Sequence, residues 1–118
     1  MNTPSFIFET HYETFQQEVI EASHKRPILV DCWADWCAPC HAIAPTLEKV
    51  IHAYAGTVAL AKLEVDEGEN MKIAGQYAVR GFPTILLFNK GEEIGRFSGA
   101  KPAHFIEEFI ASHTDLAP

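Results

Sequence analysis

Two cysteines stand three residues apart in the segment Trp36-Cys37-Ala38-Pro39-Cys40. This segment separates an apolar run that is typical of a buried strand from a longer stretch with helical periodicity. If that helix begins near Pro39, Cys37 lies at its amino end, where free N–H groups and the helix dipole favour a thiolate. A thiolate attacks disulfides, and the first helical turn brings Cys40 back within bridging distance. The spacing and position therefore predict dithiol–disulfide exchange.

Three other kinds of site fit the cysteine pair less well. A structural zinc site needs four ligands, usually from two such pairs, whereas this chain has one pair, His41 and scattered histidines. The segment from Cys37 to His41 also matches the C-x-x-C-H pattern of haem attachment. The sequence gives no sign of the export signal, second axial ligand or large apolar pocket that haem requires. Two inert core cysteines are the third alternative, and no metal ligand set is predicted.

The segments that position the pair alternate between strands and helices. Apolar or β-branched content predicts strands over residues 5–8, 28–34, 57–65, 84–88 and 94–98. The first predicted helix follows a capping box at Thr10 and ends near Pro27, and the second runs from Pro39 to Gly56. A short helix is predicted over 66–76, and a last helix begins with Pro102 as its first helical residue. Pro45 should kink the second helix. The order β-α-β-α-β-α-β-β-α predicts an α/β fold with a mostly parallel sheet flanked by helices.

The composition indicates one globular domain spanning residues 1–118, with 47% apolar and 21% charged residues. A formal charge of −7 argues against binding to nucleic acid or to an anionic membrane surface. No apolar run approaches the ~20 residues of a membrane-spanning helix. Residues 1–4 lack the basic and apolar regions of a secretory signal, so we expect a cytoplasmic location.

With these motifs in their observed order, the chain resembles the thioredoxin family from about residue 5 to residue 113. The residues that carry the resemblance are Val30–Cys40, Pro45, Lys62, Asp66, Arg80-Gly81-Phe82-Pro83-Thr84 and Gly99. Several dispersed motifs in the family's order are far more specific than one C-x-x-C. The resemblance implies the thioredoxin fold, in which helices flank a central mixed five-stranded sheet. It also implies a protein thiol-disulfide oxidoreductase that reduces protein disulfides.

The resemblance further implies roles for four residues. Cys37 matches the family's nucleophile and Cys40 its resolving cysteine, so the redox-active group is their disulfide and no bound cofactor is expected. Asp31 matches a buried carboxylate that relays a proton to or from Cys40, and Lys62 matches the lysine that tunes it. Burial in an apolar strand should raise the pKa of Asp31, because desolvation disfavours the charged form.

An apolar substrate-binding rim is expected around Cys37. Phe82-Pro83 matches the family's cis-proline loop, where the backbone of Phe82 can pair with an extended substrate segment. The residues expected to bind substrate are Trp36, Ala38, Pro39, Phe82, Pro83, Gly99 and Ala100. Trp33 and Cys32 lie within the buried strand and are expected to be core residues.

The family implies two kinds of partner, disulfide-containing protein substrates and an NADPH-dependent thioredoxin reductase. This chain has no Gly-rich dinucleotide fingerprint, so it should not bind NADPH itself. A monomer is expected, because no sequence feature suggests an interface. The alternatives are an oxidant or isomerase in an exported compartment, and a holdase or adaptor with this fold that needs neither cysteine.

Overall fold

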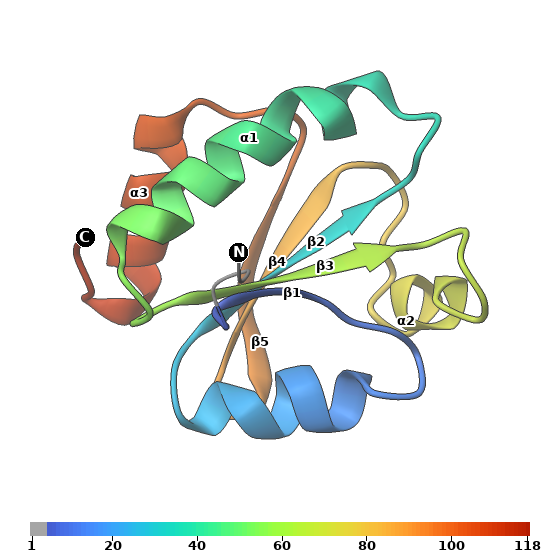
Figure 1. The fold of residues 1–118 in the computed structure, drawn as a ribbon, viewed down its shortest axis with the longest axis horizontal. Helices are drawn as coiled ribbons and strands as arrows, with labels where there is room; N and C mark the ends of the chain where they lie inside the picture. Colours follow the sequence, from blue (N-terminus) through green and yellow to red (C-terminus); the bar gives the residue numbers. More distant parts are fainter. Residues whose placement is uncertain (1–4) are drawn as a thin grey trace.

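The computed structural model describes residues 5–118, in which strands and helices alternate as predicted (Figure 1). The elements, in chain order, are β1 (Ile7–Glu9), η1 (Gln16–Glu21), η2 (Ala22–His24), β2 (Ile28–Trp33), α1 (Ala38–Ala53), β3 (Ala59–Glu64), α2 (Met71–Gln76), β4 (Thr84–Asn89), β5 (Glu92–Ser98) and α3 (Ala103–Thr114). The short η1 and η2 segments are a π-helix and a 3₁₀ turn that together form the first helical region.

The five strands of residues 5–118 form one mixed sheet in the order β1-β3-β2-β4-β5. β3 runs parallel to both β1 and β2, whereas β4 is antiparallel to β2 and β5. Helices α1 and α3 cover one face of the sheet, and η1 covers the other (Figure 1). The predicted thioredoxin fold is confirmed by this arrangement.

Strand β2 is buried on both faces, which explains its nearly continuous apolar sequence. Leu29 belongs to one hydrophobic cluster, together with Leu47 of α1. Ile28, Val30 and Cys32 belong to another, together with Val19 of η1. Each fully buried aliphatic side chain stabilises the fold by roughly 1.5–3 kcal/mol. Because β2 ends four residues before Cys37, this packing fixes the direction from which the chain enters the cysteine segment.

The predicted capping box at Thr10 is wrong. The Thr10 backbone N–H donates to Lys62 O at 3.0 Å, which continues the β1–β3 ladder, and its hydroxyl donates to Glu18 Oε1 at 3.0 Å. Long-range pairing with β3 therefore holds Thr10 in extended backbone beside the sheet. The helical region begins later, at Phe15, and no side chain among residues 5–118 caps the π-helix that starts at Gln16.

Other boundaries move by a few residues. The first strand covers Ile7–Glu9 instead of 5–8, and the hairpin strand begins at Glu92 instead of residue 94. Pro102 has extended backbone and is the residue before α3, not its first helical residue. Pro45 lies inside α1, which continues past it, while the kink expected there stays a prediction. Within residues 5–118, no helix has the length and apolar character needed to span a membrane.

Candidate active site

Cys37 and Cys40 are joined by a disulfide, with their Cα atoms 5.3 Å apart. Cys37 is the N-cap of α1 and has extended backbone, so its side chain lies at the amino end of the helix as predicted. Its Sγ accepts a hydrogen bond from the Cys40 N–H at 3.3 Å, and its carbonyl oxygen accepts from Cys40 and His41. A sulfur in this position receives the N–H groups and the positive dipole end that stabilise a thiolate.

The disulfide lies at the edge of the core beside exposed residues. Cys37 is 4% exposed and Cys40 is 1% exposed. The residues on either side of Cys37 are open to solvent, since Ala38 and Pro39 are exposed and Trp36 is 70% exposed. A partner that reaches the pair must therefore contact Trp36 or the first turn of α1.

Trp36 is held in place although most of its side chain is exposed. Its Nε1–H donates to Asp66 Oδ2 at 2.7 Å, and its ring meets the Phe82 ring edge-on with centroids 6.1 Å apart. A surface tryptophan with a fixed ring is an apolar contact that loses little side-chain freedom when a partner binds. Core packing is therefore not its main role.

The loop before β4 brings more of the predicted rim together. The Phe82-Pro83 peptide bond is cis, as the resemblance implied, and Pro83 O accepts a hydrogen bond from the Gly99 N–H at 3.0 Å. Gly99 has a φ of +89°, a conformation that favours glycine, and the exposed Ala100 follows it. Contacts therefore link Trp36 with Phe82 and Pro83 with Gly99, four of the seven residues expected to bind substrate.

Asp31 is a buried acid in the middle of the sheet, 1% exposed. Burial raises its pKa to about 7, with Glu48 adding to the rise and Lys62 opposing it. Its Oδ1 has no hydrogen-bond partner among residues 5–118. A carboxyl group in this state exchanges its proton near neutral pH, and the rise in its pKa is the one expected from desolvation.

Lys62 faces Asp31 in the register of β2 and β3, but its ammonium group binds elsewhere. Lys62 Nζ lies 3.0 Å from Glu48 Oε2 and 6.0 Å from the centre of the Trp33 ring. Glu48, in α1, is the charged residue near Asp31 that sequence reasoning missed. No local pattern marked it, because its position over Asp31 and Lys62 depends on how α1 crosses the sheet.

Cys32 and Trp33, which follow Asp31 in β2, differ from each other in burial. Cys32 is fully buried, and burial together with the charge of Asp31 raises its thiol pKa to about 12, so the thiol stays protonated. This agrees with its expected role as a small apolar core residue. Trp33 is only half-buried, contrary to expectation: its ring packs partly against the core and meets the ring of the exposed His41 edge-on.

Comparisons with known proteins agree with this geometry. A sequence model of the Thioredoxin family matches residues 6–112. The thioredoxin of Chlorobaculum thiosulfatiphilum is 39% identical over 106 residues, which cover 90% of this chain and 94% of that protein. Thioredoxin C-2 of Corynebacterium nephridii is 41% identical over 104 residues, or 88% of this chain and 93% of the relative. The thioredoxin of Pseudomonas aeruginosa is 40% identical over 101 residues, 82% and 90% of the two chains.

Proposed function

Because this chain belongs to the thioredoxin family and is a thiol-disulfide oxidoreductase, we propose that Cys37 attacks protein disulfides and Cys40 completes their reduction. The observation that carries the assignment is the place of Cys37 as N-cap of α1, with its Sγ accepting the Cys40 N–H. Cys40 lies one turn further on and is the more buried of the two, which suits a residue that attacks only its neighbour.

The reaction takes two exchanges. The Cys37 thiolate attacks one sulfur of the substrate disulfide, forming a mixed disulfide and releasing the other substrate sulfur as a thiolate, which takes a proton. The Cys40 thiol then loses its proton and attacks Cys37 Sγ. The Cys37–Cys40 disulfide forms, and the second substrate sulfur leaves as a thiolate. Two electrons have passed from the protein to the substrate, so no bound cofactor is required.

Asp31 is the proposed proton acceptor for Cys40. Its pKa of about 7 allows the carboxylate to accept a proton at neutral pH and to return it during the reverse reaction. A water molecule between the two groups would carry the proton. Lys62 and Glu48 tune this acid in opposite directions and are positioning residues, since neither is proposed to touch the reacting sulfurs.

The substrate is proposed to dock on the apolar rim formed by Trp36, Ala38, Pro39, Phe82, Pro83, Gly99 and Ala100. The exposed Trp36 ring supplies apolar area. The backbone of Phe82 is proposed to pair with an extended segment beside the substrate cysteine, as an added strand does. Specificity would then depend on access and shape more than on the side chains of the substrate.

A separate NADPH-dependent thioredoxin reductase is proposed to restore the dithiol, by analogy with the family. We further propose that residues 1–118 act as one domain, as a monomer and in the cytoplasm, where a reductant of protein disulfides has its substrates. The charge of −7 agrees with a partner that is neither nucleic acid nor an anionic membrane.

Trapping of the mixed disulfide tests the assignment of the two cysteines. The reduced Cys40→Ser variant, mixed with a disulfide-bonded protein such as insulin, should accumulate a covalent complex that dithiothreitol cleaves. The Cys37→Ser variant should form none, and Cys32→Ser, which alters the buried third cysteine, should turn over like the unmodified protein. A stable complex with Cys37→Ser and none with Cys40→Ser would reverse the two roles.

A further inference from the structure

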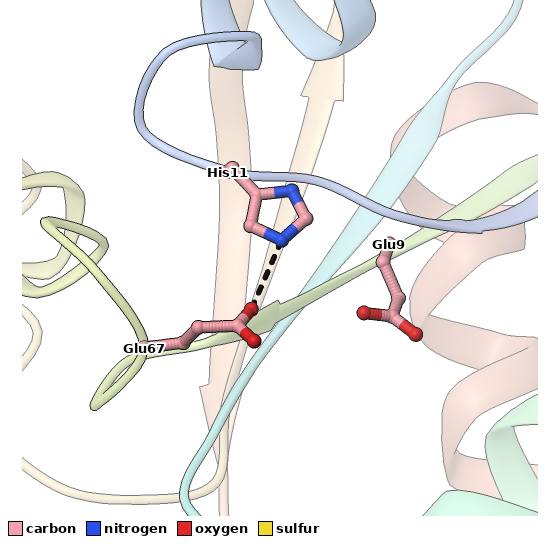
Figure 2. A group of neighbouring side chains, drawn as sticks. All are labelled: Glu9, His11 and Glu67. Atoms are coloured by element: carbon pink, nitrogen blue, oxygen red, sulfur yellow. Dashed lines mark hydrogen bonds and ion pairs between the residues drawn. The ribbon is translucent and has the colours of Figure 1, made fainter.

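A second cluster of chemically active side chains lies where β1 and β3 end. Glu9, His11 and Glu67 each present a ligand atom, and these atoms all lie within 4.8 Å of one another. His11 Nε2 is 2.9 Å from Glu67 Oε1, and the Glu9 carboxylate is on the same side of the chain (Figure 2). This combination of one imidazole and two carboxylates plays no part in the disulfide chemistry proposed above.

The sheet brings these residues together. β1 and β3 are parallel, so their carboxyl ends lie side by side, with Glu9 opposite Lys62. The bond from the Thr10 N–H to Lys62 O extends the ladder one residue further. Thr10 is buried, and the residues on either side of it, Glu9 and His11, are directed the other way by the alternation of an extended chain. Glu67 follows β3 after three residues.

One buried side chain fixes the two segments to each other. Asn70 Oδ1 accepts from the Tyr12 N–H at 2.8 Å, while its Nδ2 donates to Glu64 O at 2.9 Å. Its backbone N–H donates to Glu67 O at 3.0 Å. The backbone next to His11 and that of Glu67 are therefore held by the same residue, so the cluster is built on a fixed frame.

The charge of the cluster favours a divalent cation. With a neutral imidazole, the two carboxylates give it a charge of −2. The neighbouring Lys62 and Lys72 are paired with Glu48 and Glu69, two other carboxylates. Side-chain exposures of 41% for His11 and 53% for Glu67 leave room for an ion and its water.

We propose that Glu9, His11 and Glu67 bind one Zn²⁺ ion, with water as the fourth ligand. Imidazole nitrogen suits zinc, whereas Mg²⁺ prefers six oxygen ligands. Zinc–ligand distances of about 2.0–2.2 Å put tetrahedral ligand atoms roughly 3.3 Å apart. His11 Nε2 and Glu67 Oε1 therefore separate slightly to admit the ion, and the Glu9 carboxylate moves inward. The exposed side chains make both movements by rotation.

The bound ion would connect the edge strand β1 to the loop that leads into α2. Unfolding separates these two segments and dismantles the site, so zinc binds the folded chain and raises its melting temperature. The loop also contains Asp66, whose carboxylate accepts the hydrogen bond from Trp36 of the proposed rim. The proposed ligand Glu67 is the next residue in the chain.

Calorimetric titration of the oxidised protein with Zn²⁺ tests the site, because the disulfide prevents Cys37 and Cys40 from binding the metal. We expect one ion per chain and a melting temperature that rises by several degrees at a hundredfold excess over Kd, with no rise in Mg²⁺. His11→Ala and Glu67→Gln should each weaken binding at least tenfold, whereas His104→Ala, which alters an exposed histidine of α3, should not.

Ring resonances of the unmodified protein provide a test that needs no substitution. Zinc should shift the imidazole signals of His11 more than those of His52 or His104, and the shift should saturate at one equivalent. Absence of saturable binding, unchanged affinity in His11→Ala, or a shift confined to the other histidines would overturn the proposal.

Discussion

Lys62 lies directly opposite Asp31 in the register of β2 and β3, yet its ammonium group pairs with Glu48 of α1 at 3.0 Å. The lysine therefore acts on Asp31 through space, while a second acid holds it. Burial raises the pKa of Asp31 to about 7, Glu48 adds to the rise and Lys62 opposes it. The result is a buried acid whose charge changes at the pH where thiol exchange operates.

Replacement of Asp31 by Asn should stabilise the protein above neutral pH. Asp31 ionises near pH 3.8 in the unfolded chain and near pH 7 in the folded one. The unfolded chain therefore loses this proton first, and the free energy of unfolding falls as pH rises from about 4 to 7 and stays lower above 7. At about 1.4 kcal/mol per pKa unit, Asp31→Asn should gain on the order of 4 kcal/mol at pH 8 and little at pH 4. Urea unfolding at both pH values checks this, and an equal gain at each would contradict it.

The same variant should slow the second exchange. Without a carboxylate to accept the Cys40 proton, decay of the mixed disulfide should lose the part of its pH dependence that is centred near 7. Formation of the mixed disulfide by Cys37 should change less. Stopped-flow measurement of the two steps from pH 6 to 9 separates them. A decay rate with the same pH profile in both proteins would exclude Asp31 from proton transfer.

Lys62→Met and Glu48→Gln should shift the pKa of Asp31 in opposite directions. Loss of the ammonium group removes an attraction for the carboxylate and raises the pKa, whereas loss of the Glu48 charge removes a repulsion and lowers it. Titration of the Asp31 side-chain carbon by NMR measures both. Shifts of the same sign would mean that the Lys62–Glu48 pair acts as a unit through packing.

Trp36→Ala should weaken the binding of protein substrates but not the reduction of small disulfides. The substitution removes the most exposed ring of the proposed rim, so KM for a protein disulfide should rise several-fold. Reduction of a small disulfide, which needs no rim, should stay unchanged. Met71→Ala is the matched control, because Met71 is the other exposed large apolar residue among residues 5–118 and lies outside the rim. Equal losses in the two variants would contradict a docking role for Trp36.

The sequence predicts those parts of the molecule that depend on local pattern. Buried strands such as β2 appear as apolar runs, and the boundary between that strand and the next helix places Cys37 at a helix end, as found. The raised pKa of Asp31 also follows from its apolar neighbours. These predictions hold because burial and helix position are decided by nearby residues.

Long-range contacts decide what the sequence could not predict. Thr10 and the glutamate three residues later look like a capping box, but pairing with β3 keeps Thr10 in extended backbone. Glu48 and Lys62 are 14 residues apart and meet only because α1 packs across the sheet. Asn70 has no sequence signal, although it bonds to Tyr12 and Glu64 from one buried position.

The equilibrium potential of the Cys37–Cys40 couple decides whether the protein reduces or oxidises the disulfides of its substrates. The purified protein would be equilibrated in glutathione buffers of graded ratio, and the fraction of disulfide measured by thiol alkylation, with Cys37→Ser as the control. We expect a potential more reducing than the cytosolic glutathione pool, so that the protein donates electrons to disulfides. A potential at or above that of the secretory compartment would contradict it, because such a protein would give its disulfide away.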